Sequence, residues 1–141
     1  MQAQILETLM NVKEELGAAI ILITHDLGVI AEAADRVLVM YGGQVMETAS
    51  ADDVFGRPDH PYSRALLETM PQNHDGEGEL AVIPGSVPSA TAWPDGCRFA
   101  PRCAHAVEAC ATTMPVLEET ERGVVRCLRT DELQLADGGD A

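Results

Sequence analysis

The chain begins with apolar residues at helical spacing and continues with an unbroken apolar run. The helical spacing links Ile5, Leu9, Val12 and Leu16. These four positions lie on one face of a helix, so the sequence predicts a helix over residues 2–16. Gly17 can end this helix, because glycine readily takes the left-handed conformation after the last turn.

Residues 18–48 alternate between strand and helix patterns. The expected elements are a strand over 18–24, a helix over 27–34 capped by Asp26, a strand over 36–41, the turn Gly42-Gly43 and a third strand over 44–48. The first two strands are apolar without alternation, which is typical of strands buried on both faces of a parallel sheet. Strand, helix and strand in this order predict a right-handed parallel pair. Two buried strands are few against a typical sheet of about five, so we expect the remaining strands to precede Met1.

The second half of the chain carries weaker periodicity. The expected elements are a short helix over 50–55 capped by Ser50, a helix from 62 to 70 opened by Pro61, and a polar linker over 72–79. Everything after Ile83 is rich in proline and cysteine and lacks a helical or strand period. We expect irregular structure there, and a segment without its own apolar core needs a staple such as a metal.

The charge balance narrows the possible partners. The net charge is −14 and Lys13 is the only lysine. Nucleic-acid binding requires basic patches, so we expect no nucleic-acid partner. No signal peptide is visible, and the longest apolar run, residues 18–23, is far shorter than the ~20 residues of a membrane span. We expect a cytoplasmic protein that can still sit on a membrane protein.

His25 directly follows the first expected strand and precedes the first short helix. In open parallel sheets, ligands bind outside the carboxyl ends of the strands, where helix N-termini present N–H groups to anions. A histidine at this place can donate a hydrogen bond to a phosphate oxygen, or it can cap the turn. Its position alone leaves both interpretations open.

Four blocks of sequence follow one another in a specific order. They are Gln2-Ala-Gln-Ile-Leu6; Ile23-Thr-His-Asp26 with Ala34 to Gly43; His60-Pro-Tyr62 with Leu66-Leu67; and Pro94-Asp-Gly-Cys-Arg-Phe-Ala-Pro-Arg-Cys103. In this order they resemble the stretch after the D-loop, the switch-histidine region, the C-terminal extension and the cysteine-rich tail of ABC-transporter ATPases in the peptide and nickel branch. The resemblance covers the chain up to about Leu128, and the ordered set is highly specific.

The resemblance implies a fold and a role for His25. The fold is α/β: the C-terminal portion of a P-loop ATPase domain with a partial parallel sheet, followed by a small irregular cysteine-rich extension. His25 would be the catalytic and cofactor-binding residue that contacts the γ-phosphate of ATP, bound with Mg²⁺. The sequence contains no Gly-x-x-x-x-Gly-Lys-[Ser/Thr] loop and no signature motif. We therefore expect a fragment, from a mis-assigned start or a disrupted gene, that does not hydrolyse ATP alone.

Four cysteines carry the other candidate chemistry: Cys97, Cys103, Cys110 and Cys127. In a reducing compartment such a cluster favours metal over disulfides. The close Cys-x2-Cys pairs of structural zinc sites are absent, whereas four thiolates can hold an iron–sulfur cluster. The resemblance implies a [4Fe–4S] cluster, with zinc and free thiols as alternatives.

Two features accompany the cysteines. Arg98, Arg102 and Arg126 stand beside them, where they can offset the charge of a thiolate-bound cluster or simply be solvated. The motif His60-Pro-Tyr62 is interpreted as a helix start that docks the extension on the ATPase body.

The sequence divides into an ATPase part over 1–56, a helical extension and linker over 57–80, a cysteine-rich extension over 81–130 and an acidic tail over 131–141. The resemblance implies a second ATPase subunit and ABC permease subunits as partners, with a peptide-binding protein as an indirect one. It places the protein peripherally at the cytoplasmic side of the cell membrane, importing di- or oligopeptides or nickel. The rival hypothesis is a non-enzymatic metal-binding or interaction module.

Overall fold

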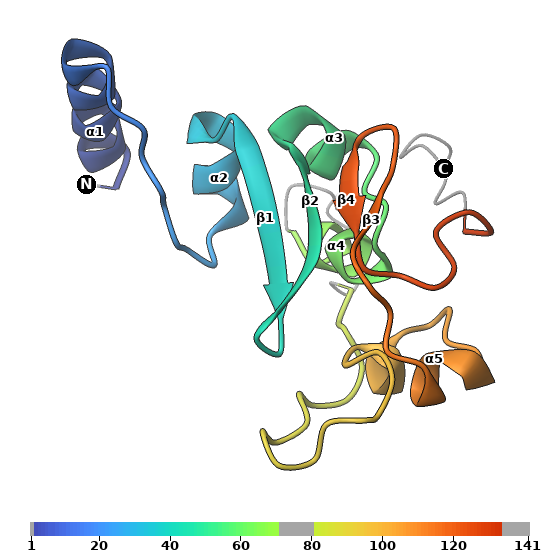
Figure 1. Ribbon diagram of the computed structural model, residues 1–141. Helices are drawn as coiled ribbons and strands as arrows, with labels where there is room; N and C mark the ends of the chain where they lie inside the picture. The colour runs from blue at the N-terminus through green and yellow to red at the C-terminus, as the bar shows by residue number, and fades with distance from the viewer. Residues whose placement is uncertain (1, 71–80, 134–141) are drawn as a thin grey trace. The chain divides into compact units, whose positions relative to one another are not determined.

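The computed structural model describes residues 2–70 and 81–133. The chain divides into two compact units, which are called here the N-terminal unit (Met1–Asp35) and the C-terminal unit (Arg36–Ala141) (Figure 1). Among the described residues, no helix is long and apolar enough to span a bilayer. The expected linker over 72–79 and most of the expected acidic tail lie outside the described residues.

The N-terminal unit contains the two helices that the sequence predicts. They are α1 (Gln2–Leu16) and α2 (Leu27–Ala33). Gly17 follows α1 with a φ of 58°, which confirms its role as a left-handed helix end. Asp26 caps α2, because its carboxylate accepts hydrogen bonds from the N–H groups of Gly28 and Val29 at 3.0 and 3.3 Å.

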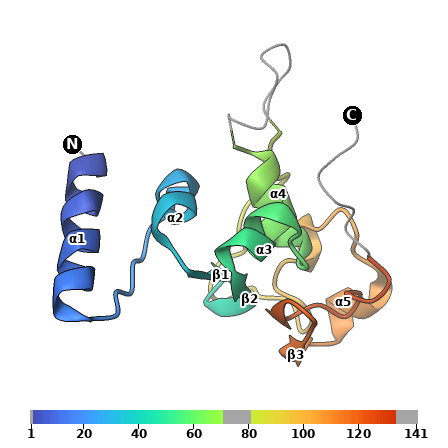
Figure 2. The same ribbon diagram turned by 90° about the horizontal axis from the view of Figure 1, so that it is seen from above.

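Residues 18–24 do not form the buried strand that the sequence predicts. They run as an extended segment between α1 and α2, without a strand partner among the described residues (Figure 2). Ile21 and Ile23 are each 92% exposed. A strand needs a neighbour to bond its backbone and cover its side chains, and the described residues supply none here. The expected parallel pair with residues 36–41 is therefore absent from them.

The C-terminal unit is built on an antiparallel hairpin of β1 (Arg36–Tyr41) and β2 (Gln44–Ser50). Gly42 and Gly43 form the two-residue turn with φ values of 56° and 78°. Positive φ at both positions suits the turn that matches the twist of paired strands, and both glycines supply it. β1 buries Val37, Val39 and Tyr41 and exposes the residues between them. It is thus buried on one face, not on both as the sequence predicts.

Two short strands complete the sheet: β3 (Glu118–Glu119) and β4 (Gly123–Val125). The strand order is β1-β2-β4-β3, and every neighbouring pair is antiparallel. The α/β class is confirmed, but the sheet of the described residues is antiparallel rather than a partial parallel sheet. The expected irregular extension after Ile83 is only partly irregular, because β4 joins the sheet beside β2.

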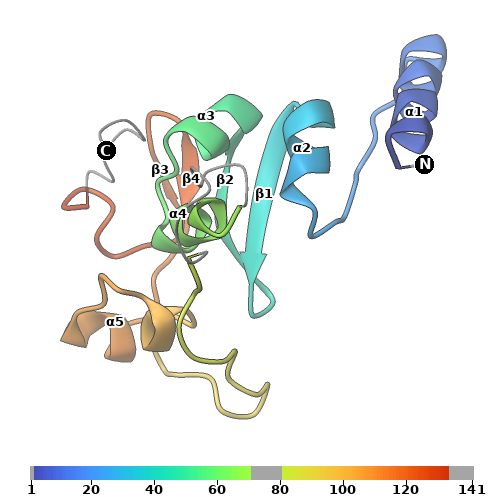
Figure 3. The same ribbon diagram turned by 180° about the vertical axis from the view of Figure 1, so that it is seen from behind.

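The two helices that the sequence predicts after the hairpin are present and pack on the sheet. They are α3 (Ala51–Gly56) and α4 (Pro61–Glu68), and both contact β2 (Figure 3). Ser50 caps α3 by accepting the N–H of Asp53 at 3.1 Å. Pro61 opens α4 at a position where the helix needs no N–H donor.

Glu47 ties β2 to the chain that enters α4. Its side chain is 2% exposed and accepts the N–H groups of Asp59 and His60 at 2.6 and 3.1 Å. Burial raises the pKa of Glu47, although these hydrogen bonds oppose the shift. Asp59 in turn accepts hydrogen bonds from Thr120 and Arg122, beside β3 and β4. One buried polar network therefore connects β2, the start of α4 and the β3–β4 turn.

The apolar core joins residues that are far apart in the sequence. Tyr41, Met46 and Phe99 form its buried centre. Phe99 packs with its ring centroid 5.2 Å from that of Tyr41 and 5.1 Å from that of Tyr62, and the Tyr41 pair is edge to face. The cysteine-rich segment is thereby anchored on the hairpin and on α4.

Candidate functional site

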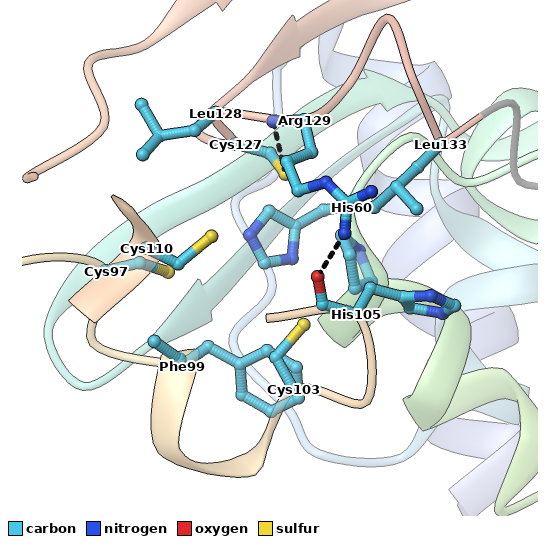
Figure 4. Close-up of a pocket in the computed structure, with 12 residues that line it drawn as sticks. His60, Cys97, Phe99, Cys103, His105, Cys110, Cys127, Leu128, Arg129 and Leu133 are labelled. Atoms are coloured by element: carbon cyan, nitrogen blue, oxygen red, sulfur yellow. Dashed lines mark hydrogen bonds between the residues drawn. The ribbon is translucent and has the colours of Figure 1, made fainter. Parts of the chain in front are cut away.

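All four cysteines line a single pocket in the C-terminal unit. The pocket holds a volume of about 20 Å³, roughly enough for one or two water molecules. Its walls include His60, Phe99 and His105 besides the cysteines (Figure 4). The fold thus gathers four cysteines that lie up to 30 positions apart in the sequence, from Cys97 to Cys127.

Cys97 and Cys110 are joined through the end of α5 (Glu108–Thr112). The N–H groups of Gly96 and Cys97 donate to the carbonyls of Ala111 and Cys110 at 3.0 and 2.8 Å. The last carbonyls of a helix lack partners within it, so these two hydrogen bonds cap α5. The same contact brings the first and third cysteines side by side.

Cys103 and Cys127 are held by local backbone geometry. Cys103 follows the 3-10 helix η2 (Ala100–Arg102). The sulfur of Cys127 accepts the N–H of Arg129 at 3.4 Å. A sulfur that accepts a backbone N–H is better able to carry negative charge.

The thiols are buried enough to resist ionisation. Burial raises the pKa of Cys103 to about 11, and it also raises the pKa values of Cys97 and Cys127. Backbone N–H groups near each sulfur oppose the shift without cancelling it. At neutral pH these three thiols are therefore protonated unless a cation binds them.

The structure brings the four predicted cysteine ligands into one pocket but does not show a metal site. All four cysteines are free thiols. Among the described residues, no three His, Cys, Asp or Glu side chains lie close enough together to hold a metal ion. The sulfurs share one pocket but do not converge on one point.

The arginines beside the cysteines bind backbone carbonyls. Arg98 donates to Gly42 O, Arg102 to Ile83 O and Pro84 O, Arg126 to Val45 O and Pro115 O, and Arg129 to His105 O. For Arg98, Arg102 and Arg126 the alternative interpretation of merely solvated side chains is therefore wrong. Arg126 does lower the pKa of Cys97, but burial outweighs its effect. Their observed contacts cross-link the loops that carry the pocket.

His60 is a pocket residue that the sequence did not reveal. Its ring is 1% exposed and lies in the same pocket as the cysteines (Figure 4). Burial lowers the pKa of His60 to about 4, so the ring is neutral at physiological pH. Spacing along the chain could not place it there, because His60 precedes Cys97 by 37 residues.

His25 lies in the N-terminal unit. It is exposed at a bend directly before the cap residue Asp26. Two N–H groups in the first turn of α2 are already bonded to the Asp26 carboxylate. An anion at this bend would therefore meet the His25 side chain rather than those two backbone donors.

Comparisons with known proteins show one protein family and several individual proteins to which the chain is similar. A family model described as "Oligopeptide/dipeptide transporter, C-terminal region" matches residues 46–110. The oligopeptide transport ATP-binding protein AppD of Bacillus subtilis is 50% identical over 133 residues, which cover 93% of this chain and 40% of AppD. A Brucella abortus protein named as a peptide import ATP-binding protein is 45% identical over 137 residues, which cover 95% of this chain and 41% of that protein.

The match includes both His25 and the cysteine pocket within one aligned stretch, since it takes in nearly the whole chain. The chain spans about two fifths of the length of these relatives. Residues 46–110 therefore match the model of an oligopeptide/dipeptide transporter C-terminal region, and the chain as a whole is similar to the C-terminal part of peptide import ATP-binding proteins.

Proposed function

We propose that this chain is the C-terminal portion of an ATP-binding subunit of an ABC importer for di- or oligopeptides. The observation that carries the proposal is the alignment over 95% of the chain with a peptide import ATP-binding protein. In this proposal residues 1–56 belong to the ATPase domain and residues 81–130 form a cysteine-rich extension. The subunit would work peripherally at the cytoplasmic face of the membrane with ABC permease subunits and a second ATPase subunit.

His25 is proposed as the residue that senses the γ-phosphate of ATP bound with Mg²⁺. Its exposure and its place before α2 leave the imidazole free to reach a ligand outside the described chain. The N–H groups of an imidazole can donate a hydrogen bond to a phosphate oxygen. The phosphate-binding loop would come from the part of the relatives that this chain does not cover.

A chimera tests this function directly. The matching C-terminal part of Bacillus subtilis AppD is replaced by this chain, and uptake of a labelled oligopeptide is measured in cells that lack AppD. We expect the chimera to restore uptake. His25→Ala should lower its rate by at least roughly tenfold, because the loss of one transition-state hydrogen bond commonly has an effect of this size or larger.

The control is Glu121→Ala, which changes an exposed side chain of the C-terminal unit outside the cysteine pocket. It should leave uptake within about twofold of the chimera, as surface substitutions generally do. A chimera that accumulates normally but takes up no peptide would refute the proposed function. Full uptake by the His25→Ala chimera would refute the role of His25 alone.

A second candidate function is binding of a [4Fe–4S] cluster by Cys97, Cys103, Cys110 and Cys127. It is favoured by one observation: the four thiols line one pocket. A cubane cluster takes one thiolate at each of four corners, so the number and type of donors match it. The segments that carry the cysteines would have to move apart on binding, because a volume of about 20 Å³ is smaller than such a cluster. When bound, the cluster would cross-link the segments that carry the cysteines.

Anaerobic purification of the full chain tests this second function. We expect a brown protein with about four irons and four sulfides per chain, the composition of a cubane cluster. Cys110→Ser should lose most of this iron, whereas Thr112→Ala, in the last turn of the same helix, should keep it. A colourless protein with one zinc per chain, or with no metal, would overturn the assignment.

A further inference from the structure

The backbone of Cys97 is hydrogen-bonded directly to that of Cys110. The N–H of Cys97 donates to the Cys110 carbonyl at 2.8 Å. Because an N–Cα bond is about 1.46 Å long and a carbonyl oxygen lies about 2.4 Å from its own Cα, this contact places the two Cα atoms at most about 6.7 Å apart. Disulfides usually span Cα distances of about 4.4–6.8 Å, so a bridge between these two cysteines is within reach of the folded backbone.

Gly96 allows the two segments to approach this closely. A Cβ atom at this position would lie 2.3 Å from the backbone oxygen of Cys110, 2.7 Å from the carbonyl carbon of Ala111 and 2.8 Å from the nitrogen of Thr112. All three are backbone atoms of α5, so they cannot rotate away as the end of a side chain could. The contact between the Cys97 segment and α5 therefore depends on a residue without a Cβ.

The thiols of Cys97 and Cys110 face the same space. Both side chains line the pocket, where Cys97 is partly exposed and Cys110 is 9% exposed (Figure 4). The backbone hydrogen bonds of Cys103 run to residues three positions away on either side, and the Sγ of Cys127 accepts the N–H of Arg129. Among the described residues, Cys97 and Cys110 are thus the two cysteines that a backbone hydrogen bond joins to each other.

We propose that Cys97 and Cys110 are a redox-sensitive pair, which a hydroperoxide converts to a reversible disulfide in the chain without bound metal. The disulfide would close the loop of residues 97–110, which carries Phe99 and Cys103. It would also take two of the four thiols that a cluster needs, so oxidation and metal loading exclude each other. This inference goes beyond the proposed transport function and does not depend on it.

The reaction begins at Cys97, which is the more exposed of the two thiols. With hydrogen peroxide, the Cys97 sulfur attacks one oxygen, the O–O bond breaks, and a sulfenic acid and one water result. The Cys110 sulfur then attacks the Cys97 sulfur, the S–S bond forms, the S–O bond breaks and a second water leaves. The two thiols thus lose two electrons and two protons. Because burial raises the pKa of Cys97, its thiolate is scarce at neutral pH, and we expect the disulfide to form over minutes to hours.

Peroxide treatment of the reduced, chelator-treated full chain tests the pair. The remaining thiols are then blocked with N-ethylmaleimide, and tryptic peptides of the monomeric fraction are analysed by mass spectrometry without reduction. Trypsin places Cys97 in the peptide 65–98 and the other three cysteines in the peptides 103–122 and 127–129. We expect one link, between the first two peptides, which dithiothreitol removes.

Three variants assign the link and its cause. Because the peptide 103–122 carries two cysteines, Cys103→Ser should keep the link and Cys110→Ser should lose it. Gly96→Ala should slow the formation of the link by about tenfold or more, since a displacement of about 1 Å between reacting groups has effects of this size. The control for Gly96→Ala is Gly56→Ala, where a Cβ would meet no atom within 4 Å, and its rate should stay within about twofold of wild type.

Several results would overturn the proposal. They are a link from the peptide 65–98 to the peptide 127–129, a link that Cys103→Ser abolishes or that Cys110→Ser keeps, and thiols that are all still reduced after hours in peroxide. An unchanged rate in folded Gly96→Ala, or the same product in concentrated urea, would also overturn it, because the fold would then not select the pair. None of these measurements needs ATP, transport or a bound cluster, so their outcome is separable from that of the chimera.

Discussion

Replacing Gly123 by alanine is expected to lower the free energy of unfolding of the C-terminal unit by about 3 kcal/mol or more. A Cβ atom at this position would lie 2.0 Å from the backbone oxygen of Thr48 and 2.9 Å from the Cβ of Ala49. Neither contact is at the end of a flexible side chain. The substitution would therefore have to push β4 away from β2, where Gly123 pairs with Ala49.

The urea midpoint of unfolding, followed by circular dichroism, measures this effect. Gly56→Ala is the matched control, because a Cβ at Gly56 would meet no atom within 4 Å. We expect the control to stay within about 0.5 kcal/mol of wild type. A Gly123→Ala protein as stable as the control would mean that β4 does not pair closely with β2.

Phe99→Ala should destabilise the C-terminal unit by about 3–5 kcal/mol, the usual range for a buried phenylalanine. Phe99 is 2% exposed and packs on Tyr41, Tyr62 and His60. Its removal leaves a cavity between the hairpin, α4 and the cysteine pocket. Because the rings of Tyr41 and Tyr62 are already fixed by other contacts, they cannot fully close it.

Phe55→Ala provides the comparison within the same chain, since Phe55 on α3 is only half-buried. Phe55→Ala should lower the free energy of unfolding by about 1 kcal/mol, clearly less than Phe99→Ala. The measurement is again the urea midpoint, combined with alkylation of Cys97 and Cys103 beside the new cavity. Equal losses of stability for the two phenylalanine variants would contradict the central place of Phe99 in the core.

Local signals in the sequence predicted the helices well. The caps Asp26 and Ser50, the opening Pro61 and the stop at Gly17 all act within a few residues of the helix they bound. Such interactions need only neighbours along the chain, so a single sequence carries them. The Gly42-Gly43 turn was predictable for the same reason.

The sequence predicted the strands less well than the helices. The apolar run over 18–24 has the composition of a buried strand but finds no partner among the described residues. Conversely, residues 123–125 carry no strand pattern yet pair with β2. Strand formation depends on a neighbour that is distant in the sequence, and side-chain composition alone does not name that neighbour.

The sequence also predicted only some residues of the candidate site. The four cysteines were recognisable from residue type and clustering, and the fold does bring them to one pocket. The place of His60 in that pocket was not recognisable, because His60 precedes the first cysteine by 37 positions. The role of the arginines was equally hidden, since their carbonyl partners lie on segments distant in the sequence.

The sequence by itself determined the helices and their ends, the hairpin turn, the resemblance to peptide-transport ATP-binding subunits and the thiols that carry the chemistry. Only the tertiary structure decided that the sheet of the described residues is antiparallel, that β4 completes it, that His60 lies in the cysteine pocket, and that the arginines bind backbone carbonyls of distant segments. The reason is physical: caps and turns are local interactions, whereas strand pairing and burial are decided by contacts between distant segments.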